Sequence, residues 1–411
     1  MTTYLLYDSA TRSPEVRHEI SEGVGDEVVF MEHDGHRIVA GASSDAEIFA
    51  KREDVVDEFW SFIELGLEAL RADDSVPAAD IGAELVVRAV QRLGVDEVIV
   101  PPTFRVQVAD LLRSRGVRLV VDSDAWAGRR RRKTPAELEG SERAQRSAEI
   151  AMLTAARMLR EAEPTTEGRL RFEGEILTAE WVRESMTAVL VQQGTDSDEI
   201  IVQSGDACLK GHEPGSGPIL PNESCIIDVF PRDRRTGAFS DMTRTFVPGR
   251  PSDDLVKLHH HCKEALNLAL DACRPGTDDL YARVADFLHS HGHPSQLHPS
   301  DPSVHDRGAG SAGPQTNGAG SAGPQTNGAG SAGPQTNQGF FHALGHGVGL
   351  EVHERPFLGR RCEALVPGDV IALEPGLYYE GVGGVRLEDT VLITDDGFEF
   401  FTDPYPYDLQ P

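Results

Sequence analysis

The chain contains 411 residues, of which 39% are hydrophobic and 26% are charged. This balance is typical of a folded chain with two or three domains and excludes a fully disordered protein. The 39 Lys and Arg residues against 67 Asp and Glu residues give a net charge of −28. A field of that sign disfavours nucleic acid and anionic membrane surfaces as partners.

Two further features bear on location. No stretch approaches the ~18 consecutive apolar residues of a membrane span, and the first residues lack the basic start of a signal peptide. The five cysteines are odd in number and include no Cys-x-x-Cys pair, which disfavours a disulfide framework or a structural zinc site. We therefore expect a cytoplasmic protein with no membrane partner.

Residues 1–125 alternate short β-rich runs with helical patterns. We expect strands over 27–31, 96–100 and 117–121, and a helix that starts after Thr103 as its N-cap. The pattern predicts a small N-terminal α/β domain without a concentrated set of catalytic residues.

A basic run, Arg129 to Lys133, follows this domain. It could form a nucleic-acid or phosphate patch, but the overall acidity favours a solvated interdomain segment. Directly after it, Thr134-Pro135-Ala136-Glu137 has the pattern of a capping box with proline at the first helical position, which predicts a helix start. We place the second domain at 134–411.

The second domain mixes helical and strand patterns. Helices are expected over 178–192 and 252–273, and strands over 200–203, 225–230, 241–246, 369–373 and 385–393. The ten-residue sequence Gly-Ala-Gly-Ser-Ala-Gly-Pro-Gln-Thr-Asn occurs three times at 308–337. With no charge, no aromatic ring and no aliphatic residue larger than alanine, it predicts a flexible loop insertion.

Several histidines cluster along the chain without a metal-site spacing. His259, His260 and His261 are adjacent, so a helix would point them in different directions, and four more lie in the loop-like stretch 289–298. We expect all of them on the surface.

Four acidic residues and one histidine share a different setting, at the ends of apolar strands or in Gly-rich turns. They are Asp228, Asp241, His346, Glu374 and Glu388. Four carboxylates brought together would repel each other and become partly protonated. Two divalent cations would balance their charge and leave room for a bridging hydroxide. Carboxylates with one imidazole suit Mn²⁺, Co²⁺ or Zn²⁺.

These residues stand in an ordered series of motifs. The series runs through Asp228, Ser240–Phe246, His342–Glu354, Glu374–Gly376 and Gly384–Thr390. It resembles the pita-bread metallopeptidases, and within them the Xaa-Pro aminopeptidases and prolidases. The resemblance covers residues 134–411 strongly and residues 1–125 only in length and layout. It implies an α+β fold, with a C-terminal curved antiparallel sheet covered by helices and a smaller N-terminal α/β domain.

The resemblance also implies roles for individual residues. Asp228 would bind one metal, Asp241 and Glu388 would bridge both, and His346 and Glu374 would bind the second. His212 would face the substrate, and His342 and His353 would flank the metal-binding histidine. His353 would also stabilise the tetrahedral intermediate. Arg386 would hold the bridging carboxylates, and Glu374 would shuttle a proton. The implied cofactors are two divalent ions, Mn²⁺ first and Co²⁺ or Zn²⁺ as alternatives. The implied partners are peptides with proline in the second position, and a second copy in a homodimer.

The chain departs from the family pattern at three places. The spacing from Asp228 to Asp241 implies a longer hairpin turn at 232–237, Ala343 stands where Gly or Ser is usual, and the repeats precede His342. Alternative functions are a creatinase-like hydrolase, a metal-retaining lyase and a binding module that has lost catalysis. The intact ligand set disfavours the first and the third. A methionine aminopeptidase is disfavoured by the leading domain.

Overall fold

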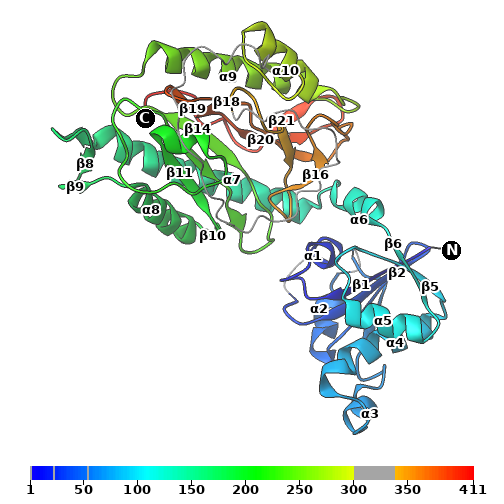
Figure 1. Ribbon diagram of the computed structural model, residues 1–411. Helices are drawn as coiled ribbons and strands as arrows, with labels where there is room; N and C mark the ends of the chain where they lie inside the picture. Colours follow the sequence, from blue (N-terminus) through cyan, green and yellow to red (C-terminus); the bar gives the residue numbers. More distant parts are fainter. Residues whose placement is uncertain (1, 22–23, 53–54, 300–337) are drawn as a thin grey trace, which may run out of the picture.

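The computed structural model describes residues 2–21, 24–52, 55–299 and 338–411 (Figure 1). The repeat insertion expected at 308–337 lies outside these residues. An N-terminal part and a larger C-terminal part lie side by side, and helices α6 (Ser123–Arg130) and α7 (Pro135–Glu161) connect them.

The N-terminal part is built on one six-stranded sheet of order β4-β3-β2-β1-β5-β6. Its strands are β1 (Thr3–Asp8), β2 (Val28–His33), β3 (His36–Gly41), β4 (Glu58–Ser61), β5 (Glu97–Val100) and β6 (Arg118–Val121). Its helices besides α6 are α1 (Pro14–Ile20), α2 (Ala46–Phe49), α3 (Leu67–Arg71), α4 (Ile81–Leu93) and α5 (Val106–Ser114). The three expected strands are present as β2, β5 and β6.

The expected N-cap at Thr103 is wrong. Helix α5 begins at Val106, and Arg105 is its N-cap residue. The amide of Phe104 donates to the carbonyl oxygen of Pro101 at 3.0 Å, so Thr103 lies inside a turn that precedes the helix.

The C-terminal part carries its strands in antiparallel sheets. A three-stranded sheet joins β11 (Ile200–Ser204), β12 (Cys225–Val229) and β14 (Met242–Phe246), and a five-stranded sheet joins β16 (Glu354–Phe357), β15 (Gly345–Gly347), β17 (Val370–Leu373), β20 (Asp389–Ile393) and β21 (Phe398–Phe400). Smaller pairings involve β18 (Gly376–Tyr379) with β19 (Gly383–Arg386), β10 (Thr195–Asp196) with β13 (Arg232–Asp233), and β7 (Glu163–Pro164), β8 (Leu170–Phe172) and β9 (Glu175–Ile176). Helix α8 (Ala179–Gln192) lies on one side of these strands, and α9 (Asp253–Ala272) and α10 (Leu280–Ser290) lie on the other (Figure 1).

Helix α7 starts as the capping box predicts. The Thr134 side chain accepts from the amide of Glu137, and the Glu137 carboxylate accepts from the amide of Thr134. Along the helix, fully buried alanines recur at helical spacing at 144, 148, 151 and 155. Small side chains at these positions let the helix pack closely against the hydrophobic core that contains β11, β12 and β14.

The strand expected over 385–393 is two strands. β19 pairs with β18, and β20 pairs with β17. The chain changes partner at Leu387 and Glu388, where the amide of Glu388 donates to the carbonyl oxygen of Thr243 at 3.0 Å. Glu388 therefore stands at the point where strands of different sheets meet. The turn expected at 232–237 is shorter, because Arg232 and Asp233 form β13; the turn follows at 234–236, and Gly237 after it has a positive φ of 78°.

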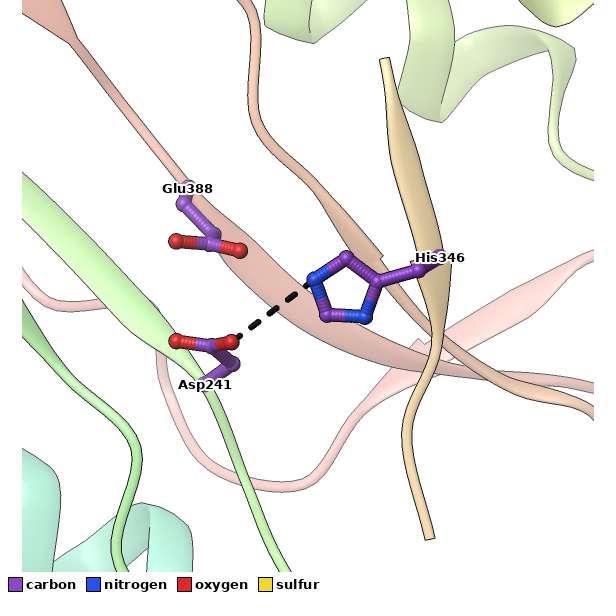
Figure 2. A group of neighbouring side chains, drawn as sticks. All are labelled: Asp241, His346 and Glu388. Carbon is purple, nitrogen blue, oxygen red and sulfur yellow. Dashed lines mark ion pairs between the residues drawn. The ribbon is translucent and has the colours of Figure 1, made fainter. Parts of the chain in front are cut away.

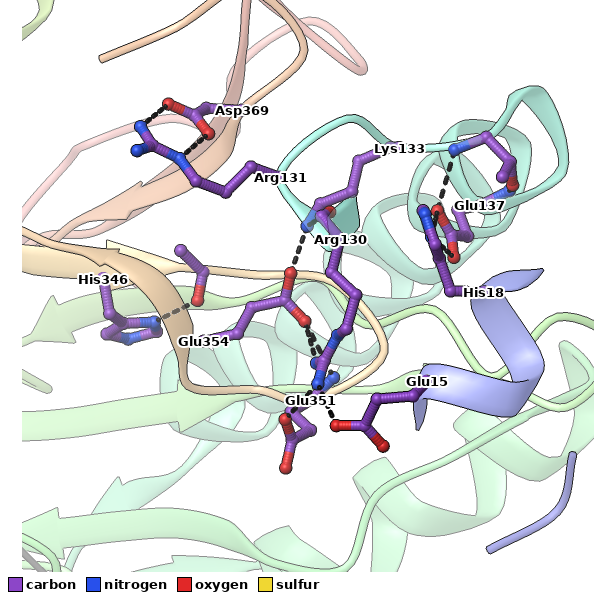
Figure 3. A network of polar contacts seen from close by, with 12 residues as sticks. Glu15, His18, Arg130, Arg131, Lys133, Glu137, His346, Glu351, Glu354 and Asp369 are labelled. Carbon is purple, nitrogen blue, oxygen red and sulfur yellow. Dashed lines mark hydrogen bonds and ion pairs between the residues drawn. The ribbon is translucent and has the colours of Figure 1, made fainter. Parts of the chain in front are cut away.

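Two expectations of solvent exposure are wrong. In the basic run, Arg130 is buried and pairs with acidic side chains from distant segments, which compensates its charge (Figure 3). Among the clustered histidines, His261 and His293 are buried. Their ring nitrogens have partners there: Nδ1 of His261 lies 2.7 Å from Nε2 of His293, and Nδ1 of His293 lies 2.7 Å from the Tyr379 hydroxyl.

None of the helices within the described ranges combines the length and apolar character that a membrane crossing requires.

Candidate active site

The predicted ligand residues come from two sheets. Asp228 lies in β12, opposite Thr243 of β14, and Asp241 directly precedes β14. His346 is the middle residue of β15, Glu374 follows β17 and Glu388 lies between β19 and β20. The structure brings all five together in the interior of the C-terminal part.

The backbone around Asp241 is fixed by Thr390, the second residue of β20. The amide of Asp241 donates to the Thr390 hydroxyl oxygen at 3.1 Å, and this hydroxyl donates to the carbonyl oxygen of Asp241 at 2.8 Å. This reciprocal pair ties the start of β14 to the second sheet, and so sets Asp241 against the residues of that sheet.

The centre of the cluster is the group Asp241, His346 and Glu388 (Figure 2). One ligand atom from each of the three lies within 4.8 Å of the others. Nε2 of His346 is 3.8 Å from Oδ2 of Asp241 and 3.8 Å from Oε1 of Glu374. The imidazole thus points at the space between the carboxylates. The two distances of 3.8 Å leave room for a cation that both kinds of ligand could share.

Three of the carboxylates carry a buried oxygen without a hydrogen-bond partner among the described residues. These atoms are Oδ1 of Asp228, Oδ1 of Asp241 and Oε1 of Glu388. Buried acceptors are normally satisfied, so three unpaired oxygens in one place are suited to binding a cation. Carboxylate oxygens with one imidazole are suitable ligands for divalent metals, and the residues present therefore fit a metal centre.

The electrostatics support the same fit. Burial, followed by the charges of Glu388 and Asp228, raises the pKa of Asp241 well above its usual range. Burial, followed by Glu374 and Asp228, does the same to the pKa of Glu388. Burial also raises the pKa of Glu374 to about 7, although Arg386 lowers it. Burial lowers the pKa of His346 to about 3, which leaves a neutral imidazole.

Arg386 is the buried cation next to this group. Its Nη2 donates to Oδ2 of Asp228 at 2.7 Å, its Nη1 to the Tyr378 hydroxyl at 3.2 Å and its Nε to Oγ1 of Thr243 at 3.3 Å. The expected contact with the bridging carboxylates differs: the guanidinium hydrogen bonds to Asp228, and the Thr243 hydroxyl donates to Glu388 at 2.7 Å. Among the described residues, Thr243 therefore relays the hydrogen bonding from Arg386 to Glu388, while burial raises the pKa of Glu388 and the charge of Arg386 acts directly to lower it.

The three predicted histidines surround the cluster to different degrees. The ring of His353 lies 4.3 Å from the ring of His346, centroid to centroid. Nδ1 of His342 lies 4.0 Å from Oε2 of Glu374, and its Nε2 lies 3.1 Å from the Tyr378 hydroxyl. His212 is exposed, and its ring makes no hydrogen bond with the described residues. It is still close enough to contribute to the lowered pKa values of the other two.

Tyr378 is a site residue that sequence reasoning missed. Its buried hydroxyl lies between His342 and Arg386. Its strand partner is Gly384, where an added Cβ would lie 2.8 Å from Cδ1 of the Tyr378 ring. A glycine facing a tyrosine across a hairpin was the signal available in the sequence.

A buried group of carboxylates and one imidazole, enclosed by antiparallel strands and helices, is the arrangement of a metallohydrolase. The sequence model of metallopeptidase family M24 matches residues 139–395. The chain belongs to this family.

The chain is similar to two Xaa-Pro dipeptidases. It is 28% identical to that of Lactobacillus delbrueckii subsp. lactis over 208 residues, which are 50% of this chain and 45% of the relative. It is 30% identical to that of Pyrococcus furiosus over 166 residues, which are 40% of this chain and 35% of the relative. The matched region spans about half the length of the curated relatives, or less.

Solved structures show the same fold over nearly the whole chain. The Xaa-Pro dipeptidase from Bacillus anthracis superposes with a TM-score of 0.70 at 21% identity, and covers 99% of this chain and 94% of its own. The X-Pro aminopeptidase from Thermotoga maritima superposes with a TM-score of 0.69 at 18% identity, and covers 99% and 97%. The predicted α+β pita-bread fold is confirmed.

Proposed function

We propose that this chain hydrolyses the peptide bond between an N-terminal residue and proline. The observation that carries the proposal is the buried cluster of four carboxylates and one imidazole, with three acceptor oxygens left unpaired. The similarity to Xaa-Pro dipeptidases supports proline specificity. An Xaa-Pro bond has no amide hydrogen and a fixed ring, so it requires a dedicated site.

In this proposal Asp228, Asp241, His346, Glu374 and Glu388 hold two divalent ions, with Mn²⁺ preferred over Co²⁺ or Zn²⁺. Asp241 and Glu388 would hold both ions, Asp228 would hold one of them, and His346 and Glu374 would hold the other. Bound ions would supply an activated water and a positive charge that polarises the carbonyl before proline. Arg386 orients Asp228 through its hydrogen bond to Oδ2.

The remaining residues handle protons and the substrate. Glu374 would accept a proton from the attacking water and pass it to the proline nitrogen as that nitrogen leaves. His353 donates to the oxygen on which negative charge develops. His342, held by Tyr378, and His212, which is exposed, close over the proline ring. A free amino terminus and a neutral ring then define the peptide that fits.

The proposal also covers the domain division, the cellular location and the oligomeric state. We treat residues 1–125 and 134–411 as the two domains. We place the protein in the cytoplasm as a homodimer. All five cysteines are free, four of them buried, which supports a reducing compartment.

The test compares matched substrates. Purified protein loaded in turn with Mn²⁺, Co²⁺ and Zn²⁺ is assayed with Xaa-Pro and Xaa-Ala dipeptides and tripeptides of the same first residue. We expect kcat/KM at least ~10²-fold higher for proline, a difference of about 2.7 kcal/mol in transition-state binding. Equal values would reject proline specificity.

A further inference from the structure

The basic linker between the two parts holds one carboxylate of the C-terminal part with two cations. Arg130, at the end of α6, and Lys133 donate to the two oxygens of Glu354 (Figure 3). Arg130 also donates from Nη1 to Oε2 of Glu351 at 2.7 Å. The side chains of Glu354 and Lys133 are 6% and 3% exposed. Charges this deeply buried are tolerated only as long as each keeps its partner.

Glu354 is the residue that follows His353 and the first residue of β16. β16 pairs with β15, in which His346 lies. The Glu354 carboxylate lies within the turn before the strand, where an added Cβ on Gly349 would meet Oε1 of Glu354 and where the amide of Glu351 donates to its Oε2 at 3.4 Å. The carboxylate therefore holds both the turn and the start of the strand.

Few contacts hold the ring of His353 in place. It makes no hydrogen bond with the described residues, and it packs against the ring of His346. A cavity of about 190 Å³ lies beside it, lined in part by Ala127, Arg130 and Glu354. Since packing leaves this side of the histidine open, its position depends on the backbone that Glu354 anchors.

The linker also holds the strand on the other side of β15. Arg131 donates to both oxygens of Asp369, at 2.8 and 2.6 Å. Asp369 is fully buried and directly precedes β17, which leads to Glu374. Arg130 further lies 3.5 Å from Glu15 of α1, so the contact extends into the N-terminal part.

We propose that Glu354 is a positioning residue: its ion pairs with Arg130 and Lys133 set His353 against the active site, and so make turnover depend on the linker from the N-terminal part. This inference rests on the proposed function for its kinetic readout. Glu354 acts through His353 and does not touch the substrate. Burial alone would raise the pKa of Glu354, but Lys133 and Arg130 hold it below its usual range, so the carboxylate is charged.

The kinetic test is a double-mutant cycle. Glu354→Gln keeps the shape and removes the charge, and we expect it to lower kcat by roughly 10-fold or more with less than about a threefold change in KM. In a His353→Ala background, Glu354→Gln should cause no further loss, because the residue that it positions is gone. Arg130→Lys, which keeps the charge, should lose about threefold or less. Independent losses that multiply in the double variant would overturn the proposal.

The matched control is Arg129→Gln. Arg129 pairs with Glu19 and Glu32 within the N-terminal part, so this variant removes ion pairs of the same kind, although less deeply buried, at the neighbouring position. We expect its kcat to match the wild type. A loss in kcat equal to that of Glu354→Gln would overturn the proposal, because it would attribute the effect to general destabilisation.

A second measurement does not depend on activity. Hydrogen–deuterium exchange of the amides in residues 348–357 should be faster in Glu354→Gln than in the wild type and in Arg129→Gln. Unchanged exchange in this segment would overturn the positioning role. If the wild type hydrolyses no Xaa-Pro peptide, the proposed function fails, and the exchange result alone decides whether Glu354 holds the His353 segment.

Discussion

Arg386 donates to Asp228 at 2.7 Å and thereby connects the strand pair β18–β19 to β12. The same guanidinium also donates to Thr243 and Tyr378. One side chain thus orients a proposed metal ligand and, through Thr243, a second one.

Arg386→Lys keeps the positive charge but cannot reach all three acceptors, because a lysine ammonium lacks the planar guanidinium. We expect divalent metal affinity to fall by roughly 10–100-fold, the usual cost of losing an outer partner of a ligand. Isothermal titration calorimetry with Mn²⁺ measures this. Tyr378→Phe, which removes one acceptor only, is the matched control and should lose less. Unchanged affinity in Arg386→Lys would show that charge alone matters.

Asp241→Asn should abolish binding of the pair of ions and nearly all activity, since Asp241 lies at the centre of the cluster. Metal analysis of the dialysed protein should find about two ions in the wild type and fewer in the variant. Added metal should raise the Tm of the wild type alone, because it binds the folded state. Full activity of the wild type after exhaustive chelation would contradict the metal assignment.

His353→Ala should lower kcat by roughly 10²–10³-fold with a smaller change in KM, if His353 donates to the developing oxyanion. Steady-state kinetics with one Xaa-Pro dipeptide measures both constants. An unchanged kcat would leave His353 as a packing partner of His346.

The metal-free protein should lose stability as the pH rises. The folded state raises the pKa of Glu374 from 4.5 to about 7, so in this window the folded chain binds a proton that the unfolded chain releases. Urea unfolding in the presence of a chelator should show the free energy of unfolding of the wild type falling relative to Glu374→Gln between these pH values. A pH-independent difference between the two proteins would contradict the raised pKa.

Deleting residues 308–337 should change the Tm by little, because the segment's composition offers nothing that could bury apolar surface. Differential scanning calorimetry of the deletion variant, beside a variant that lacks only 308–317, measures this. Loss of the cooperative transition would show that the repeats contribute to folding.

The sequence predicted what depends on local pattern. The capping box at Thr134 fixed the start of α7, and the ordered carboxylate motifs identified the residues that the fold gathers around His346. The burial of Arg130 was not predictable, because its partner Glu354 lies 224 positions away and no local pattern connects them. The contact of His261 with His293, 32 positions apart, escaped prediction for the same reason.

The division of the ligands between two sheets affects the order in which the protein assembles. Asp228 and Asp241 come from the sheet of β12 and β14. His346, Glu374 and Glu388 belong to or follow strands that lie later in the sequence. Neither half alone offers a complete set of donors, and the loops that separate them in sequence must close before the halves meet. Ions that need donors from both halves would therefore bind after the halves have met. They would lengthen the lifetime of the native state and leave the folding rate nearly unchanged.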